Sequence, residues 1–391
     1  METMPPDIVI TGIGVISQAG AGVDAFWDAL MEKRPLFSDI GSPAPVCRGR
    51  HSRLGAAAPD IDAVLDDRRF RRAANLSKFA VAAARLAIVD AGLDPAGLDP
   101  EETGLVTGVT HGAINFTREF HEALAGSGPA AASPALFSDS VLNAPAGNVS
   151  IAFNIRGPGH TVTGDLSTGI YAINMAVKTM RGSGVKVCIA GGAEELDPVV
   201  RGHYARLGLL SPCKGKDERI SPFSEAANGF VPGEGACFIV LEEREAAEAR
   251  GARVYAVVSS ISGTLKPPRQ LGEMGDGVFV SAGANGTYAD TKEAAFLKAL
   301  FGGAGGKPYI GCVKPVVGES FGASNMMQSV AALKALHSGC VPPSMIDGGG
   351  ASPVSSWARV SATAQAAALK AAVVTTAGFN DGGGVLVLKK P

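Results

Sequence analysis

Few side chains of this 391-residue chain stand in a pattern that could support nucleophilic chemistry. Ser167 and Thr168 lie directly before a segment, Gly169 to Met180, that the sequence predicts to be a helix. A serine is a poor nucleophile without a positioned base, so we favour a role in which its hydroxyl satisfies a free N–H at the helix start. His160 could reach a cavity there, although a lone histidine more often has a structural role. His111 and His203 lack a partner at a telling spacing and are assigned no role.

The overall charge excludes a general attraction to nucleic acid or to an anionic membrane. Lys and Arg number 35 against 37 Asp and Glu, which gives a formal net charge of −2. Hydrophobic residues make up 46% and charged residues 18%, which is typical of a well-buried globular protein and not of a disordered one. A local basic run, Arg68-Arg69-Phe70-Arg71-Arg72, is either a solvated helix face or a docking surface for an acidic partner.

The six cysteines are scattered along the chain, with no CxxC pair. Cys188 and Cys237 lie inside apolar runs, where cysteine usually serves as a small hydrophobic side chain. We therefore expect no disulfide framework, no metal site and no cofactor. Because no apolar run reaches membrane-spanning length and the first residues lead straight into a strand, we expect a cytoplasmic protein without a signal peptide.

Alternating apolar strands and helices predict an α/β fold with mostly buried sheets. The clearest helix is the alanine-rich segment 73–91, which ends at Gly92. Residues 32–70 are expected to be mostly loop, and 112–146 to be loops and short helices. Other expected strands are 7–17, 103–108, 161–163, 185–190, 236–241, 254–262, 309–313, 371–376 and 385–388, and other expected helices are 23–31, 169–180, 292–301 and 328–336. The strand 385–388 is fully apolar, so we expect it to be central.

These elements fall into two halves of similar rhythm, 1–250 and 251–391, which suggests an internal duplication. Short motifs follow one another through both halves. They are Ile10-Thr11-Gly12-Ile13-Gly14, Ser167-Thr168-Gly169, Gly191-Gly192-Ala193-Glu194, Ser221-Pro222-Phe223, Gly229-Phe230-Val231-Pro232-Gly233-Glu234-Gly235-Ala236, Asn285-Gly286-Thr287, Lys314-Pro315, Phe321-Gly322-Ala323 and Gly378-Phe379.

Each motif is weak alone, but the ordered set resembles the β-ketoacyl-[acyl carrier protein] synthases of the thiolase superfamily from end to end. The resemblance implies a thiolase-like, duplicated, five-layered αβαβα sandwich. It also implies a dimer formed through a strand near the helix that carries the nucleophile, and substrate contacts for Phe230 and Phe379.

The family's reaction, a decarboxylating Claisen condensation, needs a nucleophile to hold the acyl chain as a thioester. It also needs donors that stabilise the enolate formed when malonyl loses CO2. The family uses a cysteine at a helix N-terminus, where the dipole and free N–H groups lower the thiol pKa and form an oxyanion hole. Two histidines polarise the malonyl thioester carbonyl.

None of these three groups is present at the matching positions. The nucleophile position falls on Leu166, which cannot ionise or attack, and the two histidine positions fall on Asn285 and Glu319. Lys314 matches the family's active-site lysine but without its partners is expected to be structural. Asp165 and Glu319 could form a carboxylate pair, but their charge would repel an enolate and the malonyl carboxylate. Condensation by this chain is therefore not expected.

A ketosynthase-like chain without the cysteine resembles the chain length factors of type II polyketide and polyene systems. The resemblance implies a partner subunit of an active ketosynthase in a heterodimer, acting with an acyl carrier protein and helping to bound the acyl tunnel. Two departures are the leucine, where many chain length factors carry glutamine, and the segment 262–285, where a substrate-covering loop and helix are expected to be missing or short.

Three other hypotheses remain open. The chain could be an enzyme of altered chemistry, a decarboxylase or thioesterase that uses His160, Ser167 or Glu319. It could be a homodimer that binds acyl chains or acyl carrier protein. A cysteine from elsewhere in the fold could also complete a condensing site.

Overall fold

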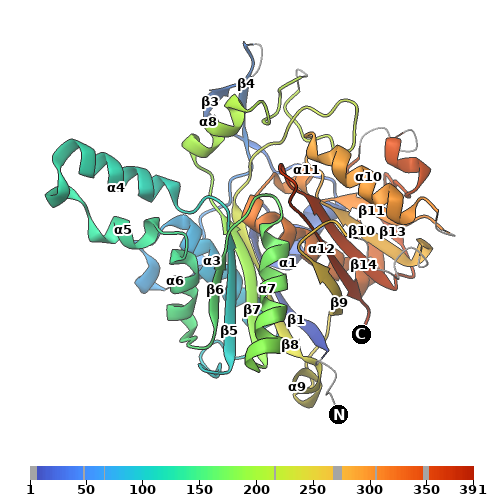
Figure 1. Cartoon of the computed structure of the whole chain (residues 1–391), viewed down its shortest axis with the longest axis horizontal. Coiled ribbons are helices and arrows are strands. Elements are labelled where there is room, and N and C mark those ends of the chain that lie inside the picture. Colours follow the sequence, from blue (N-terminus) through green and yellow to red (C-terminus); the bar gives the residue numbers. More distant parts are fainter. Residues whose placement is uncertain are drawn as a thin grey trace.

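One continuous mixed sheet forms the centre of the molecule (Figure 1). The structure, a computed structural model, describes residues 7–46, 49–65, 67–214, 217–266, 275–303, 306–346 and 352–391. Two runs of five strands meet where β1 (Ile8–Ser17) pairs antiparallel with β9 (Ala256–Ser262). The remaining strands of the first run are β5 (Thr103–Val109), β6 (Gly159–Val162), β7 (Val187–Glu194) and β8 (Gly235–Glu243). Those of the second run are β10 (Val278–Ala282), β11 (Tyr309–Cys312), β14 (Ala371–Ala377) and β15 (Gly383–Lys389).

The two runs repeat the same strand order and directions. The first is β6-β5-β7-β8-β1 and the second is β11-β10-β14-β15-β9. In each run three neighbouring strands are parallel, and the next two pairings are antiparallel. This repeat is what an internal duplication would produce. The boundary near residue 250 stays a prediction.

Helices separate and cover the two runs of strands. On one side α3 (Asn75–Asp90) packs against β1, β7 and β8, and α6 (Ala144–Phe153) packs against α3. Two helices in contact, α7 (Thr168–Ser183) and α12 (Ser324–Ser338), fill the middle, with α7 against β5 and β7 and α12 against β10 and β14. The helix α10 (Ala289–Phe301) covers the other face of β14. The layers therefore run helix, sheet, helix, sheet, helix, as expected.

Small residues let the layers approach closely. Every residue of β1 is buried, and its Gly12 and Gly14 face the backbone of α3 so closely that a Cβ would overlap the carbonyls of Ala87 and Ala83. Ten residues of α3 are buried, five of them alanines. The high glycine and alanine content is thus explained by helix–sheet contact. The apolar strand β15 is internal to the sheet, with β14 and β9 as neighbours, as predicted.

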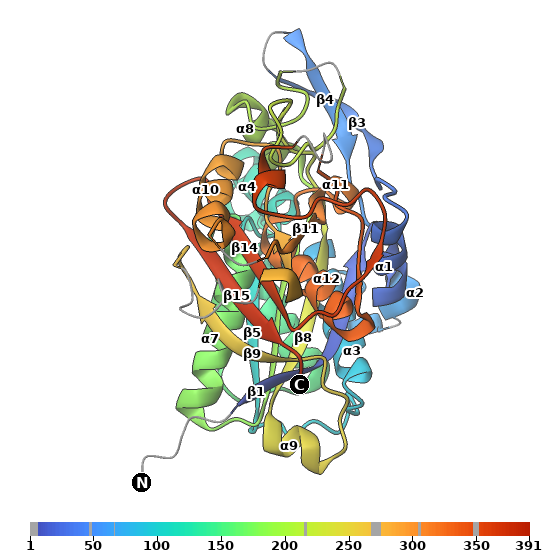
Figure 2. The same cartoon turned by 90° about the vertical axis from the view of Figure 1, so that its right-hand side faces the viewer.

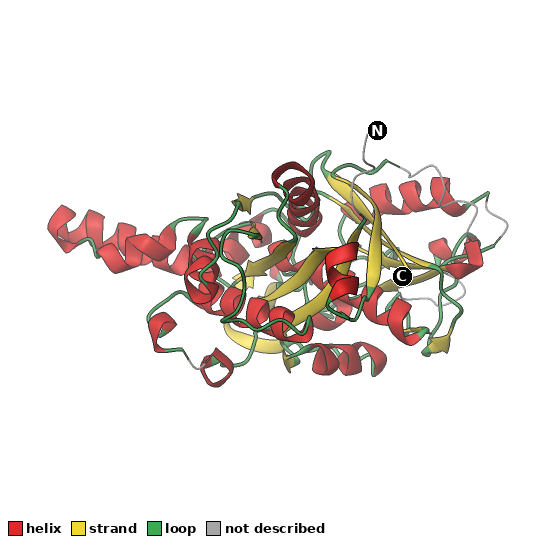
Figure 3. Ribbon diagram, turned by 90° about the horizontal axis from the view of Figure 1, so that it is seen from below, coloured by secondary structure: helices red, strands yellow, loops and turns green. Residues whose placement is uncertain are grey.

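Two extensions leave the central body. The expectation of mostly loop was wrong for residues 32–70, whereas the helices expected within 112–146 are present. Residues 32–70 contain a hairpin of β3 (Ser38–Pro45) and β4 (His51–Gly55), which reaches above the body near α8 (Pro198–Arg206) (Figure 2). Residues 112–146 contain α4 (Ile114–Ser127), a longer helix than expected, and α5 (Pro134–Ser140). These two helices lie against each other and project to one side (Figures 1 and 3). No residue of α4 is buried.

Shorter elements complete the described chain. They are β2 (Gly20–Ala21), α1 (Val23–Met31), α2 (Asp62–Leu65), η2 (Arg68–Phe70), η3 (Pro129–Ala131), α9 (Arg244–Ala249), η4 (Gly275–Gly277), α11 (Lys314–Val317), η5 (Phe321–Ala323), β12 (Cys340–Val341), η7 (Pro353–Ser356) and β13 (Gln365–Ala366). The sequence missed β10, which lies within 262–285. The part of the expected shortened lid at 267–274 lies outside the described residues, as does Cys47. Across the described ranges, no helix combines the length and apolar character that a membrane span needs.

Candidate functional site

The position matching the family nucleophile lies in an apolar cluster at the start of α7. Leu166 is fully buried beside Phe230, Phe321 and Ala377, and its carbonyl accepts a hydrogen bond from Thr376 Oγ1 at 3.2 Å. A leucine side chain here can neither attack a thioester nor donate a hydrogen bond. It contributes apolar volume where the family holds a reactive sulfur.

The carboxylate of Asp165 occupies the N-terminal end of α7. Its Oδ2 accepts the backbone N–H of Phe379 at 3.1 Å, and its Oδ1 accepts that of Ser167 at 3.3 Å. A negative charge at a helix N-terminus is stabilised by the helix dipole. Gly378 permits the approach, since a Cβ there would overlap the carboxylate. Two N–H donors that could hold a developing oxyanion are therefore bound to the protein's own anion.

Ser167 does not play the role expected of it. It is the N-cap residue of α7, but its side chain makes no capping hydrogen bond. The hydroxyl is fully buried and has no hydrogen-bond partner within the described ranges. The prediction that it satisfies a free N–H at the start of α7 was wrong.

Asn285 and Glu319, which the motifs predict to match the family histidines, join one buried polar network with Lys314. The Lys314 Nζ lies 2.7 Å from Glu319 Oε2, and neither side chain has any exposed surface. Lys314 also donates to the Gly283 carbonyl at 2.5 Å. Asn285 Nδ2 donates to the same Oε2 of Glu319 at 2.8 Å. A buried carboxylate and a buried ammonium thus neutralise each other, as burial of charge requires.

The rest of this network is also internally satisfied. Glu319 Oε1 accepts the Phe321 N–H at 3.0 Å and the Ser324 hydroxyl at 2.6 Å. Asn285 Oδ1 accepts the Thr287 hydroxyl at 2.7 Å. No atom of the Glu319 carboxylate is left to take a proton or orient a substrate. The carboxylate pair considered for Asp165 and Glu319 does not form, because each side chain has other partners.

Two further buried carboxylates, Asp290 and Glu293, hold the backbone around Asn285. Asp290 accepts the N–H groups of Phe223, Asn285 and Gly286 at 2.9–3.0 Å. Glu293 accepts the Gly283 N–H at 2.8 Å and the Thr375 hydroxyl at 2.5 Å. Burial raises the pKa of Asp290, and it raises the pKa of Glu293 to about 7. Both act as structural acceptors.

Aromatic rings fill the space next to Leu166. Phe230 and Phe379 are the two predicted substrate contacts. Phe230 is fully buried, and the centroids of the two rings lie 6.3 Å apart. Tyr204 stacks on Phe321 with centroids 4.9 Å apart. The Tyr288 hydroxyl donates to the Phe379 carbonyl at 2.9 Å. The two predicted substrate contacts therefore lie together, and their role toward a substrate stays a prediction.

The histidines do not supply a replacement catalytic group. His160 is exposed on β6, the edge strand of the first run, so it is not brought into the cluster. His111, to which the sequence assigned nothing, lies against the cluster with Nδ1 3.1 Å from Glu194 Oε1 and Nε2 3.0 Å from the Tyr204 hydroxyl. Across the described residues no group of three or more His, Cys, Asp and Glu could hold a metal ion.

Comparison with known proteins gives the family context of this geometry. The family model "Beta-ketoacyl synthase, N-terminal domain" matches residues 6–247, and "Beta-ketoacyl synthase, C-terminal domain" matches residues 277–346. The 3-oxoacyl-[acyl-carrier-protein] synthase 2 of Rhizobium meliloti (strain 1021) is 29% identical over 372 residues, covering 86% of this chain and 88% of the relative. A protein of Streptomyces cyaneus, whose name places it with polyketide β-ketoacyl synthases, is 30% identical over 372 residues, covering 86% and 87%.

Solved structures agree with the sequence comparison. The ishigamide ketosynthase/chain length factor superposes with a TM-score of 0.85 at 25% identity, covering 99% of this chain and 100% of that one. A β-ketoacyl synthase from Burkholderia phymatum STM815 has a TM-score of 0.82 at 22% identity over 99% and 100% of the two chains. The thiolase-like fold is therefore confirmed. The chain belongs to the β-ketoacyl synthase family.

Proposed function

We propose that this chain is a non-condensing β-ketoacyl synthase homologue that pairs with an active ketosynthase, in the manner of a chain length factor. The observation that carries the proposal is the closed network of Lys314, Glu319 and Asn285 beside a buried Leu166. Three groups needed for condensation are replaced: Asn285 and Glu319 bond to each other, and Leu166 is buried in an apolar cluster.

The replacements are unsuited to the family's chemistry for physical reasons. A thioester intermediate requires sulfur, and Leu166 has only carbon at that place. An enolate is stabilised by hydrogen-bond donors. Glu319 is instead an acceptor with a negative charge, and it is already paired with Lys314. The donors at the start of α7 are held by Asp165. None of these features favours the altered-chemistry hypothesis, since Ser167 is buried and His160 is exposed elsewhere.

Exposed apolar side chains around β6 support association with a second ketosynthase-like chain. The strand β6 is at the edge of the sheet, with α6 and α7 in contact with it and α5 against α6. These elements and the loop after α5 carry Phe137, Val141, Leu142, Ile151 and Met175, which are 36–61% exposed. Grouped apolar exposure of this kind marks a protein interface. The chain length factor named in the similar ishigamide structure supports a heterodimer.

The basic run gives a place for an acyl carrier protein as the acidic partner. Arg68, Arg71 and Arg72 are exposed and make no ion pair within the described ranges, whereas Arg69 is bonded to Asp67 at 2.6 Å. Unpaired guanidinium groups attract carboxylates and phosphates. A structure with the same fold at 22% identity is a type II PKS acyl-carrier protein in complex with its ketosynthase. A cytoplasmic location is part of this proposal.

Coexpression with each ketosynthase encoded near this chain tests the pairing. We expect one such partner, with intact Cys and two His, to copurify in equal amounts. A chain that stays a separate homodimer beside every intact ketosynthase would contradict the heterodimer and favour the homodimeric binding protein. Ile151→Asp at the exposed apolar surface should weaken pairing, while Val89→Asp, exposed on α3 away from β6, serves as the matched control.

A further inference from the structure

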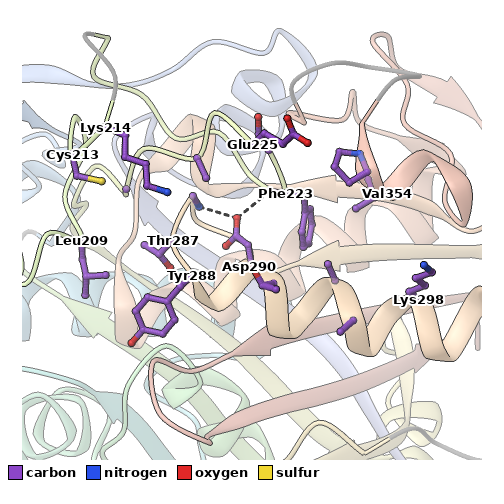
Figure 4. Close-up of a pocket in the computed structure, with 18 of the residues that line it drawn as sticks. Leu209, Cys213, Lys214, Phe223, Glu225, Thr287, Tyr288, Asp290, Lys298 and Val354 are labelled. Atoms are coloured by element: carbon purple, nitrogen blue, oxygen red, sulfur yellow. Dashed lines mark hydrogen bonds between the residues drawn. The ribbon is translucent and has the colours of Figure 1, made fainter.

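A cavity of about 700 Å³ lies beside α10 and borders the Asn285 network at Thr287 (Figure 4). Its lining comes from α10, from the loop 286–288 before it, from the loops around Leu209 and Phe223, and from η7. Leu166, Lys314, Glu319 and Phe379 do not line it. The volume is within the range of about 300–1,000 Å³ typical of small-molecule sites.

One wall of the cavity is a face of α10 with small side chains. Thr291, Ala294, Ala295 and Lys298 line the cavity at helical spacing, so they share one side of the helix. The opposite wall is apolar and rigid, since Phe223, Val354 and Trp357 are at most 6% exposed. A ligand in this cavity would therefore lie between small side chains and a packed apolar wall.

Two lysines and two carboxylates line this cavity, and they differ in how accessible they are to a ligand. Lys214 and Lys298 are both exposed, and neither side chain has an ion pair or hydrogen bond within the described part of the chain. Figure 4 shows them at opposite sides of the cavity, with Phe223 between them. Glu225 is exposed at the rim, whereas the Asp290 carboxylate is not available because it binds three backbone N–H groups. Two free ammonium groups thus face one free carboxylate.

We infer that this cavity binds a small amphipathic anion, an apolar chain ending in a carboxylate, of the fatty-acid type. The apolar part lies against Phe223, Val354 and Trp357, and the carboxylate pairs with Lys298 or Lys214. Ion pairs at a partly dry rim provide orientation, and burial of the chain provides most of the affinity. The inference does not depend on the proposed function, because Leu166 and the Lys314–Glu319 pair do not line the cavity.

Calorimetric titration of the full chain with laurate tests the site, with dodecyltrimethylammonium as a probe that has the same chain but a cationic head. We expect saturable binding of laurate and weak binding of the cation. The double variant Lys214→Ala/Lys298→Ala should bind laurate roughly tenfold more weakly. Lys292→Ala is the matched control, because Lys292 is on the same helix but outside the cavity lining. It should bind laurate as the unmodified chain does.

Two further measurements locate the ligand. The chain has two tryptophans, of which Trp357 lines the cavity and Trp27 lies in α1, so laurate should change the Trp357 fluorescence in a Trp27→Phe background. Ala295→Trp, which fills the cavity from an exposed position of α10, should abolish binding. Equal affinity for laurate and the cation, unchanged affinity in the double lysine variant, or no saturable binding of laurate would each overturn the inference.

Discussion

The backbone N–H of Phe379 donates a hydrogen bond to the carboxylate of Asp165, with 3.1 Å between N and Oδ2. This contact joins the turn after β14 to the start of α7, two segments more than two hundred residues apart in the chain. It fixes a negative charge on two backbone N–H donors at the start of α7 and in the turn after β14. Under the proposed function, this contact would oppose condensation in addition to the replaced side chains.

Asp165→Ala should destabilise the fold without creating condensing activity. The Phe379 and Ser167 N–H groups would lose their acceptor, and α7 would lose a charge that stabilises its N-terminus. We expect the free energy of unfolding to fall by about 1–3 kcal/mol, measured by denaturant titration. Asp165→Asn keeps an acceptor oxygen without the charge, so its free energy of unfolding should lie between those of Asp165→Ala and the unmodified chain. Equal stability of all three proteins would show that the contact has no energetic role.

Removing one partner of the buried ion pair should be costly. Lys314→Met leaves the Glu319 carboxylate buried without its cation, and a loss of about 3–5 kcal/mol in unfolding free energy is expected. Combining it with Glu319→Gln removes the unpaired charge, so the double variant should be more stable than Lys314→Met alone. A double-mutant cycle measures the coupling. Additive effects of the two substitutions would be inconsistent with the pair described here.

Restoring the cysteine alone should not restore condensation. In Leu166→Cys the thiol gains a position at the helix start, but Asn285 and Glu319 still stand where two imidazoles are needed. With malonyl-loaded and acyl-loaded acyl carrier protein as substrates, we expect mass spectrometry to detect no ketoacyl product. The variant Leu166→Ala serves as the control for background decarboxylation. Product from Leu166→Cys at a rate above this control would contradict the account.

Stability should fall as pH rises from about 5 to 8, in part because of Glu195. Burial, reinforced by the charges of Glu194, Glu234 and Asp197, raises the Glu195 pKa from 4.5 to about 8. The folded state therefore holds a proton that the unfolded state releases above pH 4.5, so stability is lost between these two values. Glu195→Gln removes this titration and should reduce the loss between pH 5 and 8 by roughly 1–3 kcal/mol.

The comparison for Glu195→Gln is the unfolding free energy at several pH values for both proteins. Glu119→Gln, at an exposed position of α4, is the control and should follow the unmodified chain. Parallel pH profiles for Glu195→Gln and the unmodified chain would show that Glu195 does not titrate in this window.

Elements with a buried apolar face were predictable from the sequence, and elements without one were not. The strand β8 and the helix α7 have strong apolar patterns and were predicted within a few residues. The hairpin of β3 and β4 was missed because its segment is rich in Gly, Pro and Ser. Its strand β4 is bound by Glu218, a residue distant in the sequence, whose carboxylate accepts the Ser52 hydroxyl and the backbone N–H groups of Arg53 and Leu54.

At the site, the sequence could single out residues but not their partners. The motifs predict that Leu166, Asn285 and Glu319 match the family's catalytic positions, which stays a prediction, and the structure brings Asn285 and Glu319 into contact. Their mutual bond joins residues from separate loops, and no local pattern records such a pairing. The role of Asp165 was missed for the same reason, because its partner is the backbone N–H of Phe379, which carries no side-chain signal.

The most direct test is the amount of elongated acyl carrier protein formed by this chain reconstituted with its active ketosynthase partner, when the partner's nucleophilic cysteine is replaced by alanine. The account predicts elongation by the unmodified pair and none by the pair with the substituted partner, since the proposed nucleophile position of this chain is Leu166, which cannot carry an acyl thioester. Elongation that persists after the partner's cysteine is removed would contradict it.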